Sequence, residues 1–126
     1  MAARVEILAV GSLQGALAPA ARHYLDLLRP YVGVSVREVR EVPLQGRAPA
    51  EVLREEARRL ARAWPRQPVV AALAVDGRQL SSEAFADWLQ AAFERGGAGF
   101  VLGGPLGLAA ELLARTDERL SLSAMT

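Results

Sequence analysis

The sequence predicts an α/β fold, in which helices cover both faces of a mostly parallel, five-stranded sheet. Three observations predict it. Strand-like and helix-like segments alternate along the chain, which favours parallel pairing through helical crossovers. Two of the strand-like segments are apolar at nearly every position, as expected of strands that are covered on both faces. The length of 126 residues suits one domain, which we expect to span residues 1–126.

The first three elements follow one another closely. Val5–Val10 is a short apolar run and predicts a buried strand. Leu17–Leu28 has apolar residues at helical spacing, and Pro30 ends this predicted helix. Valines alternate with polar and charged residues in Val32–Val42, which predicts a second strand with one face toward solvent.

The middle of the chain contains the clearest helix and the most apolar strand. The loop Pro43–Pro49 precedes a helix over Glu51–Trp64, in which arginines and glutamates surround an apolar side. Pro68–Val75 is almost entirely apolar and predicts a strand inside the sheet, with Val69–Leu73 central. The dipeptide Asp76-Gly77 is typical of a turn after such a strand.

Four further elements follow the Asp76-Gly77 dipeptide. Ser81 and Ser82 open a predicted helix that runs through Phe93, and Gly96-Gly97 closes it. Three further elements follow, which are a buried strand at Ala98–Leu102, a helix at Leu108–Arg115 and a strand at Leu120–Met125. We expect the last of these strands to expose apolar surface.

Composition excludes several kinds of site. The chain has no cysteine, which excludes disulfides, thiolate zinc sites and a cysteine nucleophile, and its one histidine excludes a multi-histidine metal centre. No window approaches the roughly 20 apolar residues of a membrane-spanning helix. We therefore expect a cytoplasmic protein that uses neither a metal nor a membrane. The net charge of +1 is too small to indicate a nucleic-acid partner by itself.

A glycine turn, Gly103-Gly104-Pro-Leu-Gly107, joins a predicted strand to a predicted helix. Open α/β sheets bind ligands at such positions, and glycine lets the backbone approach a ligand closely. The turn matches neither a dinucleotide fingerprint nor a Walker loop, so its spacing alone favours a tight structural turn. Asp76 is likewise favoured as a turn residue over a ligand, and His23 with Asp26 as an exposed helical pair over a catalytic one.

All 15 basic residues are arginine, and three of them form a stripe on the long helix. Arg54, Arg58 and Arg62 recur every four residues, so they share one helix face. Two interpretations remain equally open. The stripe binds an anionic partner such as RNA phosphate, or it is a solvated face in which nearby glutamates pair with the arginines.

Two segments together resemble the RlmH family of SPOUT-class methyltransferases. They are FVLGGPLGL at Phe100–Leu108 and RLSLSAMT at Arg119–Thr126, which are similar to the family patterns IGGxxG and LSLSxxT. Weaker similarities extend the resemblance over all 126 residues, and they are Ile7–Gly11, Tyr24, Leu28, Glu41–Pro43 and Leu73–Gly77.

The resemblance implies transfer of a methyl group from S-adenosylmethionine to N3 of a pseudouridine in large-subunit ribosomal RNA of the 70S ribosome. It also implies a homodimer and a cofactor held at a deep trefoil knot. The residues that it implies for cofactor binding are Leu73, Gly104, Leu122, Ser123, Ala124, Met125 and Thr126. It implies no catalytic residue within this sequence, because the family's candidates lie in a further C-terminal segment.

That further segment threads the knot, lines the pocket and forms the dimer contact in the family. Because the sequence ends at Thr126, we expect residues 1–126 to be C-terminally incomplete, to form no knot, to bind S-adenosylmethionine weakly or not at all, and to have no methyltransferase activity. Two other functions stay open. One is a non-enzymatic remnant, and the other is a flavodoxin-like module that binds a small ligand or phosphate at the glycine turn.

Overall fold

The computed structural model describes residues 3–13 and 15–123 and contains a five-stranded sheet in the order β2-β1-β4-β3-β5. All four pairings between neighbouring strands are parallel, which confirms the predicted fold class. The strands are β1 (Arg4–Val10), β2 (Gly33–Val39), β3 (Val69–Gln79), β4 (Gly97–Leu102) and β5 (Glu118–Ser121). The helices are α1 (Leu17–Leu28), α2 (Pro49–Arg62), α3 (Ser82–Arg95) and α4 (Ala110–Arg115).

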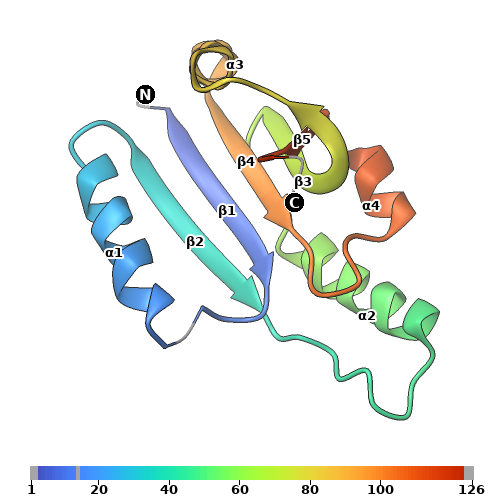
Figure 1. Cartoon of the computed structure of the whole chain (residues 1–126). Coiled ribbons are helices and arrows are strands. Elements are labelled where there is room, and N and C mark those ends of the chain that lie inside the picture. The colour runs from blue at the N-terminus through green and yellow to red at the C-terminus, as the bar shows by residue number, and fades with distance from the viewer. Residues whose placement is uncertain (1–2, 14, 124–126) are drawn as a thin grey trace.

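Helices cover both faces of the sheet (Figure 1). Successive strand residues point to opposite faces, so the strands contribute apolar side chains to a cluster on each face. On one face Val5 and Ala98 belong to a core cluster that is completed by side chains of α3. On the other face Leu8 and Val101 pack with side chains of α2 and α4. Helix α1 lies beside β2 at the edge of the sheet (Figure 1), and none of its side chains is buried.

The helix boundaries follow local signals that were visible in the sequence. Ser81 caps α3, since its Oγ accepts a hydrogen bond of 3.0 Å from the Ala84 amide, and Gly96 ends the helix with a φ of 125°. Helix α2 begins two residues earlier than predicted, at Pro49, because proline suits the first turn of a helix. Helix α1 has the predicted bounds.

Strand β3 differs from its prediction in length and in its ending. It is an interior strand between β4 and β5, as expected, although β4 is the middle strand of the five. It runs on to Gln79, so the predicted turn at Asp76-Gly77 lies within it. The register shifts there, and Leu73 and Arg78 both pair with Leu120. The second half of β3 therefore curves around β5 (Figure 1).

Strand β5 is shorter than predicted, and its apolar residue is covered. It spans Glu118–Ser121, and Leu120 and Ser121 are only 3% and 4% exposed. The expectation that this strand exposes apolar surface is therefore wrong for Leu120, because β3 encloses it from two sides. Leu122, just beyond the strand, is 76% exposed. Ala124, Met125 and Thr126 lie outside the described residues.

Candidate functional site

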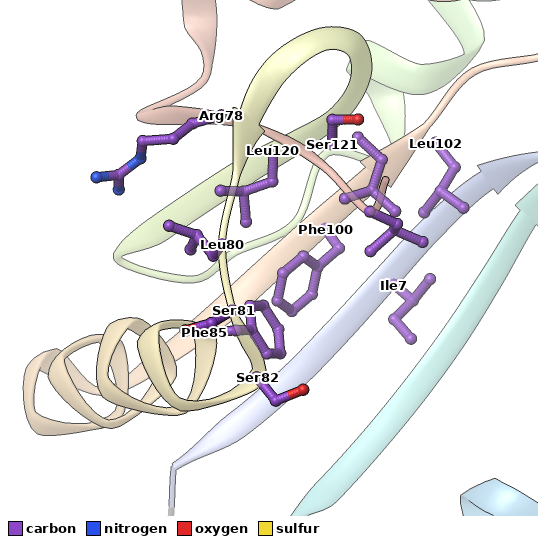
Figure 2. A pocket seen from close by; sticks show the side chains of 12 residues that line it. Ile7, Arg78, Leu80, Ser81, Ser82, Phe85, Phe100, Leu102, Leu120 and Ser121 are labelled. Atoms are coloured by element: carbon purple, nitrogen blue, oxygen red, sulfur yellow. The ribbon is translucent and has the colours of Figure 1, made fainter. Parts of the chain in front are cut away.

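A cavity of about 400 Å³ lies between the sheet and the start of α3, near the carboxyl ends of β3, β4 and β5 (Figure 2). Three sources supply its walls. The strands contribute Ile7, Leu73, Phe100, Leu102 and Leu120; the passage from β3 into α3 contributes Arg78, Leu80, Ser81, Ser82 and Phe85; and the end of β5 contributes Ser121 and Leu122. Ligands of open parallel sheets bind outside the carboxyl ends of the strands, so the position suits a binding site.

The cavity is mostly apolar, and aromatic rings form its floor. Phe85 and Phe100 lie together in Figure 2, with ring centroids 6.1 Å apart. Trp88 packs beside both, at 6.0 Å from Phe85 and 5.7 Å from Phe100. Such offset and tilted ring pairs stabilise a packed cluster. The floor is therefore held by the same contacts that attach α3 to the sheet.

Polar groups lie at the rim. The Ser121 hydroxyl donates a hydrogen bond of 2.9 Å to the Ser123 carbonyl. Arg78 points away from the cavity in Figure 2, and its guanidinium bonds the Glu118 carboxylate at 2.8 Å. Because Glu118 is on β5, this ion pair attaches the curved half of β3 to the strand that it encloses.

The structure brings some of the predicted cofactor residues together and separates one from them. Leu73 and Leu122 both line the cavity. Ser123 is exposed directly after Leu122. Gly104 is not among the described residues that line the cavity, although it lies two positions after Leu102, which does. A Cβ added at Gly104 would point to the α2 side of the sheet, where it would lie 3.2 Å from a methyl carbon of Val10 and 3.4 Å from a carboxylate oxygen of Glu56.

Comparison with known protein families identifies the family of the chain. A family model described as "Predicted SPOUT methyltransferase" matches residues 3–126. The chain belongs to the SPOUT methyltransferase family. The alternative of a flavodoxin-like module loses its support, because the match spans the whole sheet and both motifs rather than the glycine turn alone.

Several relatives of this SPOUT methyltransferase have been named for an RNA substrate. Ribosomal RNA large subunit methyltransferase H of Rubrobacter xylanophilus is 44% identical over 130 residues, which cover 100% of this chain and 82% of that protein. The protein of the same name from Anaeromyxobacter sp. is 40% identical over 98% of this chain and 81% of its own length. A Caldanaerobacter subterraneus protein, methyltransferase H 2, is 33% identical over 98% of this chain and 86% of its own.

The arginine stripe of this SPOUT methyltransferase is exposed along α2. Within the described part of the chain, Arg54, Arg58 and Arg62 take part in no ion pair or side-chain hydrogen bond. Glu55 pairs instead with Arg47 at 2.7 Å and with Arg59 at 3.4 Å. Glu56, which sequence spacing offered as a partner for Arg58, is buried and points into the molecule. The structure therefore leaves the stripe without the neutralising partners that a paired, solvated face would have.

Two minor candidates do not form sites. Asp26 pairs with Arg29 at 3.3 Å, and His23 packs edge-on against Tyr24, with ring centroids 5.5 Å apart. Asp76 lies 3.8 Å from Arg119 as an exposed ion pair. In residues 3–13 and 15–123 no cluster of three or more histidine, aspartate or glutamate side chains could hold a metal ion. The helices in the same ranges include none that is long and apolar enough to cross a membrane.

Sequence inspection missed much of the cavity wall. No role was predicted for Arg78 or Leu80, and Phe85 was placed only within a predicted helix and Phe100 only at the start of the glycine-turn motif. A signal was present, because two aromatic residues at positions 85 and 88 lie on the α3 face that covers β4. The curved end of β3 had no such signal, since Asp-Gly ordinarily ends a strand.

Proposed function

We propose that this protein transfers a methyl group from S-adenosylmethionine to large-subunit ribosomal RNA in the cytoplasm, at N3 of a pseudouridine. The observation on which this rests is the apolar cavity at the carboxyl ends of β3, β4 and β5, which contains Leu73 and Leu122 of the implied cofactor set. The ribosomal RNA substrate is supported by the names of relatives that are up to 44% identical over the whole chain.

The residues of the cavity fit the cofactor's chemistry. A volume of about 400 Å³ falls in the range of small-molecule sites. The flat adenine ring suits an apolar slot between Leu73, Leu102 and Leu122, while the polar edge of a base needs backbone N–H and C=O groups. Strand ends and glycine turns offer such groups. S-adenosylmethionine would supply an electrophilic methyl group on sulfur.

The protein's own contribution to this transfer is mainly positioning. Methyl transfer is an in-line displacement, so the acceptor nitrogen must be aligned with the sulfonium methyl. Apolar walls keep water away from the reacting centre. The imide nitrogen of the base must also lose a proton. Among the described residues of the cavity wall there is no carboxylate and no histidine, and we assign no catalytic residue.

We include the arginine stripe on α2 in the RNA-binding surface. Arg54, Arg58 and Arg62 repeat at i, i+4 and i+8 on a 14-residue helix, so they follow one line along it. Arginine binds phosphate through planar, paired donors. Glu55 forms its ion pairs with Arg47 and Arg59 and with none of these three arginines. The charges of the stripe are therefore available to phosphate groups.

We further propose that the protein is a homodimer in which α1 adds to the contact that the C-terminal segment forms in the family. This helix buries none of its side chains against its own sheet. Leu17, Tyr24 and Leu28 recur along one side of it and are 65%, 65% and 43% exposed, and Tyr31, in the turn after the helix, is 85% exposed. A continuous apolar surface of this kind is typical of association sites.

A methyl-transfer assay tests the substrate and the cofactor together. Ribosomes that lack this modification are incubated with methyl-labelled S-adenosylmethionine and with the chain joined to the C-terminal segment of the Rubrobacter relative. We expect label in 23S-type RNA, recovered as a methylated pseudouridine after nuclease digestion. Label in another nucleoside would contradict the N3-pseudouridine proposal, and no label in ribosomal RNA would contradict the substrate class.

A matched pair of variants locates the reaction. Leu122→Asp puts a charge on the cavity wall at a residue that is 76% exposed, so the fold should tolerate it. Leu44→Asp makes the same change at a residue that is 41% exposed and not among the described residues of the cavity wall. We expect the first variant to lose most of the labelling and the second to retain it.

A further inference from the structure

Glu56 is a buried carboxylate that the proposed function does not use. It lies on the inner stripe of α2 with Val52 and Leu60, and it is 3% exposed. One of its oxygens, Oε2, accepts a hydrogen bond of 3.1 Å from the Val42 amide. The other, Oε1, is buried and has no hydrogen-bond partner among the described residues.

This arrangement is poorly explained by stability. A buried carboxylate oxygen without a donor destabilises the fold relative to an apolar side chain of similar size. The neighbouring positions on the same stripe are Val52, Ala57 and Leu60, which are the residues that helix–sheet packing requires. The charged group at position 56 therefore needs a reason other than packing.

The carboxylate lies against the glycine turn. A Cβ at Gly104 would lie 3.4 Å from Oε1 and 3.6 Å from Oε2 of Glu56, and 3.2 Å from a methyl of Val10. Gly104 does not have a positive φ, in contrast to Gly107, whose φ is 77°. Its backbone conformation therefore does not require glycine. A side chain here would meet Val10 tightly and would lie in van der Waals contact with Glu56.

Helix α2 also holds the segment that leaves β2. Besides the bond from Val42 to Glu56, the Arg59 guanidinium donates a hydrogen bond of 2.7 Å to the Arg40 carbonyl. The glycine turn is closed separately, since the Gly107 amide donates to the Gly104 carbonyl at 2.9 Å. Glu56 thus lies between two segments, since it accepts a hydrogen bond from the 40–42 segment and lies next to the turn after β4.

We propose that Glu56 is a positioning residue, which sets the backbone of the glycine turn at Gly104, two positions after Leu102 of the cavity wall. This inference rests on the proposed function for its meaning, because Gly104 is one of the residues implied for cofactor binding. The length of the side chain matters for this role, since the carboxylate must reach Gly104 and accept from Val42 at the same time.

Four substitutions test the role in residues 1–126 by NMR. Glu56→Asp shortens the side chain and keeps its charge, Glu56→Ala removes it, and Glu56→Gln keeps its length and its acceptor for Val42. Glu51→Gln is the control, because Glu51 is exposed in the first turn of the same helix. We expect Glu56→Asp and Glu56→Ala to shift the backbone amide resonance of Gly104, and Glu56→Gln and the control to leave it in place.

A thermal double-mutant cycle distinguishes positioning from a general structural role. Gly104→Ala should lower the melting temperature of the unsubstituted chain, and by less in Glu56→Ala, where the added methyl meets Val10 but no longer Glu56. Additive effects on melting, together with an unshifted Gly104 amide in Glu56→Asp, would overturn the proposal. If Glu56→Ala does not fold, the Glu56→Asp and Glu56→Gln spectra decide by themselves.

Titration of S-adenosylmethionine into the same variants, each joined to the C-terminal segment of the Rubrobacter relative, separates the two proposals. We expect Glu56→Asp to raise the Kd by about tenfold, the effect of losing roughly one hydrogen bond to the ligand, and Glu56→Gln to retain binding. If the unsubstituted chain does not bind S-adenosylmethionine, alone or with the added C-terminal segment, the proposed function is overturned. The effect of Glu56 on the Gly104 amide, which is measured without ligand, would still stand. A shifted Gly104 with unchanged affinity would overturn the link to the cofactor site.

Discussion

Gly77 lies where the backbone of β3 crosses the backbone of β5. A Cβ at this position would be 2.5 Å from the carbonyl carbon of Leu120 and 2.8 Å from its nitrogen. Backbone atoms of an enclosed strand cannot move aside as a flexible side chain can. Position 77 therefore requires glycine for close approach rather than for an unusual φ.

We predict that Gly77→Ala destabilises the fold by about 1–3 kcal/mol, the usual cost of forcing an extra methyl group into a packed region. The measurement is urea unfolding followed by fluorescence of the two tryptophans. Gly33→Ala is the control, since its Cβ would meet only the terminal atoms of the Arg4 side chain within 4 Å. Equal stability of the two variants would show that β3 does not enclose β5 tightly.

Single residues were predictable from the sequence where a local signal existed. The Ser81 cap was visible because its hydroxyl acts within one turn of helix. Leu73 and Leu122 were implied by the resemblance, and both line the cavity. Gly77 and Glu56 were not predictable in their roles, because their partners, Leu120 and Val42, lie 43 and 14 residues away in the sequence.

At the scale of elements, helix α2 has two faces with different tasks. Its inner stripe packs against the sheet through Val52 and Leu60 and places Glu56. Its outer stripe holds the three unpaired arginines. Sequence periodicity distinguished the two faces, since the helical repeat alone separates them. It could not decide whether Glu56 or Glu55 would pair with arginine, because that depends on which carboxylate the sheet buries.

We predict that Arg54→Ala combined with Arg58→Ala weakens binding to ribosomal RNA and reduces its salt dependence. Each lost phosphate contact should lower the slope of log affinity against log salt by about 0.7–0.9. Filter binding at several salt concentrations measures the slope. Arg22→Ala with Arg29→Ala removes the same charge from α1 and its C-terminal cap and should leave the slope unchanged. If both double variants give the parent slope, the stripe is a solvated face.

The start of β5 was not predictable from the alternation of apolar residues. Alternation in Leu120–Met125 predicted a strand, and β5 begins two residues before that range, at Glu118. Asp117 explains the start, because its carboxylate accepts from the Val70 amide at 2.8 Å and its own amide donates to the Val70 carbonyl at 2.8 Å. Such pairing to a distant strand leaves no periodic trace in the sequence.

For the whole molecule, alternation of elements was sufficient to predict the parallel sheet and the helices on both faces. The order of the strands was not predicted, since several orders satisfy the same alternation. The exposure of α1 was not predicted either. Apolar residues at helical spacing indicate a helix that covers a core, and α1 buries none of its side chains.

We predict that Tyr24→Glu combined with Leu28→Glu converts a dimer of this protein into monomers. Both side chains are exposed on α1, and a charge in an apolar interface weakens association by about 2 kcal/mol or more when it replaces a central aromatic residue. Sedimentation velocity gives the mass of each species. Leu44→Glu is the control. A monomeric unsubstituted chain would remove the dimer proposal.

The central claim is that S-adenosylmethionine binds at the carboxyl ends of β3, β4 and β5. Leu73 and Leu122 line this cavity, and the resemblance implies that the C-terminal segment supplies the rest of the pocket. Without that segment we expect the gains from burial to be small against the cost of immobilising the ligand. Isothermal titration of S-adenosylmethionine is the most direct test. We predict weak or undetectable binding to residues 1–126 and clear binding once the C-terminal segment of the Rubrobacter relative is attached. Absence of binding to both chains would contradict the claim.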